Sequence, residues 1–119
     1  NIENHIPLAE VEGDQEGELL ILGWGSTYGS ITSARERLLA KGYNVSRVHL
    51  KYLNPMPKNL GDILNRFKTV LVPEMNLGQL SMLLRANYLK DITGFNKVQG
   101  LPFKASEIEK KVIELLTDK

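Results

Sequence analysis

The amino-acid sequence predicts a three-layer α/β/α domain with a mostly parallel sheet of about five strands. Short, strongly apolar runs such as Leu19–Leu22 and Thr69–Pro73 alternate with segments whose apolar residues recur at helical spacing. Short links join these segments, and strands that alternate with helices in this way form a parallel sheet with helices on both faces. A chain of 119 residues with 42% hydrophobic residues is also long enough to bury one core.

The expected strands and helices follow one another closely along the chain. In order, they are a strand at 19–22, a helix at 30–41, a strand at 45–52, a helix at 60–67, a strand at 69–73, a helix at about 80–88, a strand at 92–98 and a final helix. Gly42 follows the first helix, where a left-handed cap residue commonly ends a helix. Ser106 and Glu109 have the spacing of a capping box, which predicts the start of the final helix.

Residues 1–17 are polar and rich in turn residues, so we expect a lead-in to a domain at residues 18–119. The apolar stretch Ile6–Val11 could add a short edge strand, which Pro7 would weaken.

The composition excludes several functions. The formal net charge is only +1, which argues against nucleic acid or a membrane surface as a partner. No transmembrane run or signal-peptide pattern is seen, so we expect a cytoplasmic location. The sequence has no cysteine to serve as a nucleophile or to hold an iron–sulfur cluster, and neither His5 nor His49 has metal-ligand spacing. We therefore expect no metal, cofactor or catalytic residue in this chain.

A glycine-rich turn, Gly23–Gly29, follows the first strand and has two interpretations. Its backbone N–H groups could cradle a phosphate at a helix N-terminus, as in a Rossmann-like nucleotide-binding module. The dinucleotide fingerprint, however, requires glycine where Tyr28 stands, and no acidic residue ends the next strand. A tight turn that needs glycine for close packing is the favoured interpretation.

A second polar segment, Pro73–Leu80, follows the third strand. It carries Glu74, Asn76, Gly78 and Gln79 at the carboxyl edge of the sheet. Glu74 could act as a general base, but no partner for acid–base chemistry is identifiable. Capping and interface hydrogen bonds are therefore favoured.

Two further groups of side chains could bind a partner. The basic residues Arg47, His49, Lys51 and Lys58 could hold a carboxylate or phosphate, although a solvated strand face is the favoured interpretation. Five large side chains are expected at one sheet edge, either as a docking surface or as a cover for the loops. They are Trp24, Tyr28, Tyr52, Met56 and Phe103.

Several motifs, in order, resemble those of one known domain. They are Leu22–Gly29, Val48–Leu50, Asn54–Pro57, Pro73–Leu80 and Lys97–Phe103. The series resembles the C-terminal domain of the 2-oxoacid:ferredoxin oxidoreductase alpha subunit, particularly of the 2-oxoglutarate type. The resemblance implies a transketolase C-terminal-like fold in which one edge strand runs antiparallel, and a chain that is part of a longer subunit.

The resemblance also implies a function for the complete enzyme. It converts a 2-oxoacid and coenzyme A to an acyl-CoA and CO2 and reduces ferredoxin, with thiamine diphosphate, magnesium and iron–sulfur clusters bound in other domains or in the beta subunit. This chain would be an accessory domain that is inactive alone and packs against its neighbours. The residues implied for an interface or the active-site entrance are Gly23, Trp24, Gly25, Ser26, Tyr28, Glu74, Asn76, Gly78 and Gln79.

Overall fold

Four parallel strands form the sheet of the computed structural model, which describes residues 7–51, 56–75, 79–88, 92–97 and 102–117. The strands are β1 (Gly17–Trp24), β2 (Ser46–Leu50), β3 (Phe67–Met75) and β4 (Ile92–Lys97). Their order across the sheet is β2-β1-β3-β4, and every neighbouring pair is parallel. The predicted α/β class is therefore confirmed, with β1 and β3 in the centre.

The fifth, antiparallel strand is reduced to one bridge within the described residues. The Glu12 N–H donates to the Arg47 carbonyl at 2.9 Å, and the Arg47 N–H donates to the Glu12 carbonyl at 3.0 Å. The Asn59 side chain pairs with both backbone groups of Ala9, at 2.9 and 2.8 Å. We call residues 7–12 the strap. Asn59 thus holds the strap at Ala9 beside the start of α2, and within the described residues the strap pairs with β2 only at Glu12.

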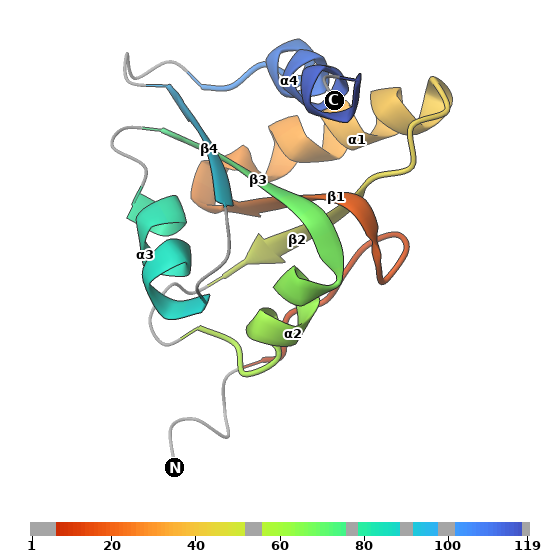
Figure 1. The fold of residues 1–119 in the computed structure, drawn as a ribbon. Helices are drawn as coiled ribbons and strands as arrows, with labels where there is room; N and C mark the ends of the chain where they lie inside the picture. Colours follow the sequence, from red (N-terminus) through yellow and green to blue (C-terminus); the bar gives the residue numbers. More distant parts are fainter. Residues whose placement is uncertain (1–6, 52–55, 76–78, 89–91, 98–101, 118–119) are drawn as a thin grey trace.

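Helices cover both faces of the sheet (Figure 1). They are α1 (Tyr28–Ala40), α2 (Leu60–Asn65), α3 (Gln79–Tyr88) and α4 (Ala105–Thr117), and a short 3-10 turn, η2 (Gly25–Thr27), precedes α1. In Figure 1, α1 and α4 lie on one face, whereas α2 and α3 lie on the other. The predicted three layers are thus present.

Alternating side chains of the central strands fill two separate cores. Leu20 and Leu22 of β1 point to the face covered by α2 and α3, whereas Leu19 and Ile21 point to the face covered by α1 and α4. A strand buried on both faces reads as a continuous apolar run, which is why Leu19–Leu22 is apolar throughout. The two cores fix β1, and with it the turn that follows.

Two predicted element boundaries are wrong. Phe67 was assigned to a helix, but α2 ends at Asn65 and Phe67 begins β3 with its side chain buried. The predicted capping box lies two residues too late, because α4 begins at Ala105. It is Glu107 that accepts the N–H of Lys104 at 2.8 Å, as the acidic residue of a capping box does.

The final helix is amphipathic and short. It has 13 residues, and Ile108 and Val112 are buried against the sheet. No helix in the described ranges is long and apolar enough to cross a membrane.

Candidate functional site

The glycine turn after β1 is shaped by close packing. A Cβ atom on Gly23 would overlap Cδ1 of Ile31 and lie 2.9 Å from Oγ1 of Thr27. Gly25 has a φ of +63°, which is the left-handed region that favours glycine. Both glycines are thus required by the turn itself, which supports the packing interpretation over the phosphate cradle. In addition, β2 ends at Leu50 without an acidic residue that could bind a ribose.

Glu74 connects this turn to the start of α3. Its Oε1 accepts the Leu80 N–H at 2.8 Å, and its Oε2 accepts the Ser81 N–H at 2.9 Å. The indole Nε1 of Trp24 donates to the same Oε1 at 3.3 Å. Glu74 is only 1% exposed, and buried polar oxygens require hydrogen-bond donors of this kind. The capping interpretation of Glu74 is therefore confirmed, and both of its oxygens are engaged.

The other predicted residues of this edge are only partly described. Asn76 and Gly78 lie outside the described residues, and of Gln79 only the backbone is described, as the first residue of α3. Gly25 and Ser26 are exposed at the turn. The structure thus brings together Gly23, Trp24 and Glu74, whereas Tyr28 joins a different cluster.

Tyr28 packs against two basic residues of β2. The guanidinium of Arg47 lies 4.4 Å from the centroid of the Tyr28 ring, and the His49 ring meets the same ring edge-on at 4.9 Å. Arg47 also donates to Oγ1 of Thr32 and, at 3.5 Å, to the carbonyl of Tyr28. These contacts tie β2 to the first turn of α1.

The prediction that Arg47 lies on a solvated strand face is wrong. Its side chain is 1% exposed, because α1 covers this face of β2 as it covers β1. Parallel strands are normally covered on both faces, so the position of β2 in a parallel sheet was the signal for burial. Glu12 and Thr32, which accompany Arg47, were not predicted, because neither lies near it in the sequence.

Burial changes the proton affinity of both basic residues. It lowers the pKa of Arg47, and the negative charge of Glu12, whose carboxylate lies 3.6 Å from Nε of Arg47, opposes this effect. Burial also lowers the pKa of His49, and the positive charges of Arg47 and Lys51 lower it further. His49 is therefore neutral at neutral pH, whereas an arginine stays charged.

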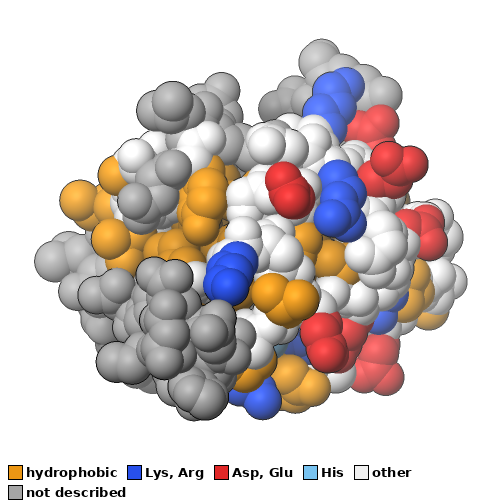
Figure 2. Space-filling model, turned by 90° about the horizontal axis from the view of Figure 1, so that it is seen from below, with side chains coloured by type: hydrophobic (Ala, Val, Ile, Leu, Met, Phe, Trp, Pro, Cys, Tyr) orange, Lys and Arg blue, Asp and Glu red, His pale blue; other side chains and the backbone are white. Residues whose placement is uncertain are grey.

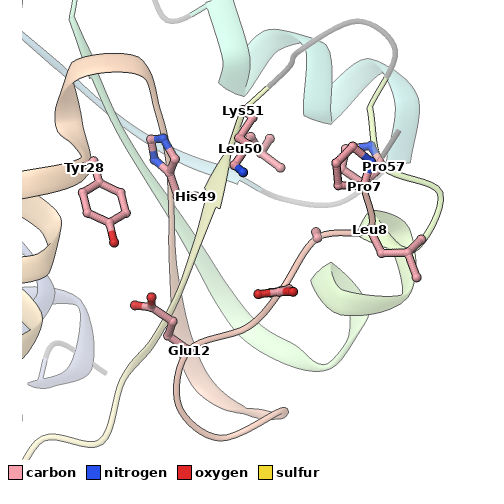
Figure 3. A pocket seen from close by; sticks show the side chains of 10 residues that line it. Pro7, Leu8, Glu12, Tyr28, His49, Leu50, Lys51 and Pro57 are labelled. Carbon is pink, nitrogen blue, oxygen red and sulfur yellow. The ribbon is translucent and has the colours of Figure 1, made fainter. Parts of the chain in front are cut away.

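A pocket of about 220 Å³ opens between the strap and the end of β2 (Figure 3). In Figure 3, Tyr28 and His49 lie on one side, Pro7, Pro57 and Leu8 on the other, and Glu12 rises from the strap. Its lining residues are Pro7, Leu8, Ala9, Glu10, Glu12, Tyr28, His49, Leu50, Lys51 and Pro57. Sequence reasoning missed this pocket because the strap carries no periodic pattern.

The large side chains predicted at one edge do not form a common docking surface. Phe103 is 5% exposed and belongs to the core beneath α1 and α4, whereas Trp24 and Met56 are half-buried against the opposite core. Tyr28 is 49% exposed, and Tyr52 lies outside the described residues. Among the described members of the group, Tyr28 has the largest exposed fraction.

The described residues do not fit a magnesium ion or an iron–sulfur cluster. No group of three His, Asp or Glu side chains in the described ranges could hold a metal ion, and Glu74 is already engaged by backbone N–H groups. The sequence has no cysteine to supply thiolates.

No family model matches the sequence, but individual proteins do. The 2-oxoglutarate oxidoreductase subunit KorA of Mycobacterium tuberculosis is 48% identical over 105 residues, which cover 87% of this chain and 16% of KorA. The chain thus spans about one sixth of the length of that relative.

Solved structures agree with this similarity. The 2-oxoglutarate:ferredoxin oxidoreductase of Magnetococcus marinus, solved with 2-oxoglutarate, coenzyme A and succinyl-CoA bound, superposes with a TM-score of 0.90 and 34% identity. The match covers 98% of this chain and 21% of that chain. A split-gene transketolase superposes with a TM-score of 0.68 and 21% identity, over 92% of this chain and 41% of the transketolase chain. At this identity the match shows a shared fold only.

Proposed function

We propose that this chain is an accessory and assembly domain of the alpha subunit of a 2-oxoacid:ferredoxin oxidoreductase. The premise is that the chain is homologous to part of such an alpha subunit. The complete enzyme would convert a 2-oxoacid and coenzyme A to an acyl-CoA and CO2 and reduce ferredoxin in the cytoplasm. Its preferred substrate would be 2-oxoglutarate. The observation that carries this proposal is the 48% identity with KorA over 87% of the chain.

The carboxyl edge of the sheet supports an accessory role. In open α/β sheets, ligands usually bind at this edge. Here Glu74 caps α3 and holds Trp24, while Gly23 and Gly25 serve the turn. Glu74, Gly23 and Gly25 thus maintain the fold, which makes these residues poorly suited to catalysis.

The exposed part of the same edge is suited to contact a neighbouring domain. Gly25, Ser26 and Tyr28 stand at the surface in the turn that follows Trp24, whose indole N–H donates to Glu74. Asn76, Gly78 and Gln79 belong to the same proposed interface by their place after β3. We propose that residues 18–119 form the domain and that this edge faces the rest of the subunit or the beta subunit.

The reactive groups would be held elsewhere in the complete enzyme. Thiamine diphosphate supplies the carbanion chemistry of 2-oxoacid decarboxylation when bound. We propose that the other domains and the beta subunit hold these groups and that this chain acts by packing and orientation.

Two preparations test the proposal. The isolated chain should not reduce ferredoxin when given 2-oxoglutarate and coenzyme A. The complete enzyme should do so, and deletion of residues 18–119 from its alpha subunit should abolish assembly with the beta subunit, measured by light scattering. Ferredoxin reduction by the isolated chain, or normal assembly of the deleted enzyme, would refute the proposed role.

A further inference from the structure

Helix α3 is apolar on its outer face as well as on its inner face. Leu80 and Leu84 point into the core and are fully buried. Met82 and Ala86 stand four residues apart on the opposite side, and residues at this spacing share one face of a helix. Met82 is 63% exposed, Leu83 beside it is 39% exposed, and Ala86 is exposed as well. These three residues form the outer face of α3.

The charged residue of α3 does not interrupt this apolar surface. Arg85 is the only charged residue in the sequence of α3. Its guanidinium donates to the carbonyl of Ile92, from Nε at 3.2 Å and from Nη2 at 2.5 Å. The charge is thus directed toward β4, and the outer face of α3 is uncharged.

Helix α4 shows the contrasting pattern of a helix that remains in water. Ile108 and Val112 are buried against the sheet, whereas Lys110 and Glu114, also four residues apart, are exposed on the outer side. A surface helix typically has such a charged outer face, and a helix that is apolar all round is typical of a protein interior. Helix α3 therefore has the composition of a helix that is covered on both sides.

The outer face of α3 adjoins the proposed interface and is held rigidly. Glu74 accepts the N–H groups of Leu80 and Ser81 in the first turn and also binds Trp24. A Cβ on Gly94 would lie only 3.2 Å from Oγ of Ser81, so α3 packs closely on β4. Hydrophobic side chains are most concentrated on the left in Figure 2, the side on which α3 lies in Figure 1. The face is a preformed extension of the carboxyl edge.

The uncharged outer face indicates the kind of surface that covers α3. Permanent interfaces are more hydrophobic than transient ones, and the centres of interfaces are poor in charged residues and rich in methionine and aromatic residues. Met82, Leu83 and Ala86 include a methionine and no charge. Polar groups of a partner would lose their hydration on this face without gaining a hydrogen bond. The covering surface is therefore apolar and remains in place.

We propose that the outer face of α3 docks permanently against an apolar surface of another domain of the same alpha subunit. The docking rests on the proposed function, in which this chain is one domain of such a subunit; the matches cover only 16% of KorA and 21% of the Magnetococcus marinus chain. A cover on the same polypeptide is present whenever α3 is present. A beta subunit would leave the apolar face bare until assembly, and bare apolar surface promotes aggregation.

Photo-cross-linking in the full-length alpha subunit identifies what covers α3. Met82 is replaced by p-benzoylphenylalanine, and in a control Lys110, exposed on α4, is replaced in the same way. Mixed heavy and light isotope-labelled subunits distinguish cross-links within one subunit from those between two. Position 82 should cross-link within one alpha subunit to peptides outside residues 1–119, with or without the beta subunit. No cross-link, one to the beta subunit or to a second alpha subunit, or an equal yield at position 110 would overturn the proposal.

Methionine oxidation gives a second readout without a bulky probe. Met82 is more exposed than Met56 in this chain, so hydrogen peroxide would oxidise Met82 faster if α3 were uncovered. In the full-length alpha subunit, Met82 should instead be oxidised more slowly than Met56. Ala86→Asp places an unpaired charge in the covered face and should raise the oxidation rate of Met82 about 10-fold or more.

The matched control is Ser33→Asp, which adds the same charge to an exposed position on α1 and should leave the oxidation rate of Met82 unchanged. Faster oxidation of Met82 than of Met56 in the unaltered subunit, or equal rates for Met82 in both aspartate variants, would overturn the docking. Both measurements are made on the alpha subunit alone. They can therefore fail while assembly with the beta subunit, which tests the proposed function, is normal.

Discussion

The polar groups at the centre of the sheet differ from those at its β2 edge in how fully they are paired. At the centre, Glu74 is buried and both of its oxygens accept backbone N–H groups. At the edge, Arg47 is equally buried, yet its Nε and the nearby Nδ1 of His49 lack a hydrogen-bond partner within the described residues.

The difference follows from the position of each strand. β3 has a strand on either side, and α3 begins directly beyond its end, so the donors that Glu74 needs are supplied by the fold. β2 has a strand on one side only, and the strap pairs with it at a single bridge. The polar groups at the centre are therefore fully paired by the fold, whereas those at the β2 edge are less completely paired within the described residues.

Figure 2 shows a second contrast on the surface. Viewed from below the orientation of Figure 1, hydrophobic side chains are most concentrated on the left of the face, whereas acidic side chains lie mainly on the right. Met82 and Leu83 of α3 are among the exposed large hydrophobic residues.

Removal of the Glu74 carboxylate should have the largest effect on stability. Glu74→Ala leaves the N–H groups of Leu80 and Ser81 buried without an acceptor, which should lower the free energy of unfolding by about 3 kcal/mol. Urea unfolding measures the loss. The exposed Glu36→Ala should change stability by less than about 0.5 kcal/mol. A loss of similar size in both variants would contradict the role of Glu74.

Alanine substitutions at the two ends of the glycine turn should change the stability of the protein in opposite directions. Gly23→Ala should destabilise by about 1–3 kcal/mol, because the added methyl group overlaps Ile31 in a packed core. Gly29→Ala meets no atom within 4 Å and lies in the first turn of α1, so it should stabilise by about 0.5 kcal/mol. Thermal unfolding measures the change in stability of both variants. Equal changes in melting temperature would argue against a turn defined by packing.

The smallest effect is expected from the protonation of His49. Burial, followed by Arg47 and Lys51, lowers its folded-state pKa, while Glu12 opposes the change. The unfolded chain therefore binds a proton first as the pH falls below about 6.5, and the stability that neutral His49 contributes above that pH is lost. His49→Gln should reduce the drop in unfolding free energy between about pH 7.5 and about pH 5.5. An unchanged drop would show that His49 does not titrate in this way.

Local patterns were sufficient to predict the central strands. The apolar run at Leu19–Leu22 identified β1, and the position of Glu74 after a buried strand indicated its capping role. Phe67 could not be assigned correctly, because an apolar residue seven positions after Leu60 suits the end of a helix as well as the start of a strand.

The cluster at the β2 edge depends on residues far apart in the sequence. Arg47 is covered by Tyr28 and Thr32 of α1 and by Glu12 of the strap, and none of these contacts has a local signal. The pocket is lined by both the strap and the end of β2, and Asn59 holds the strap at Ala9. Such features require the tertiary arrangement and were not predictable from periodicity.

The most direct measurement compares two serine variants in the complete oxidoreductase. Ser26 is exposed at the proposed interface, and Ser33 is exposed on α1 away from it. The fraction of alpha subunit assembled with beta subunit, measured by light scattering, should fall sharply for Ser26→Arg and remain at the wild-type value for Ser33→Arg. Full assembly of the Ser26→Arg enzyme would contradict the claim that this edge of the sheet contacts the beta subunit.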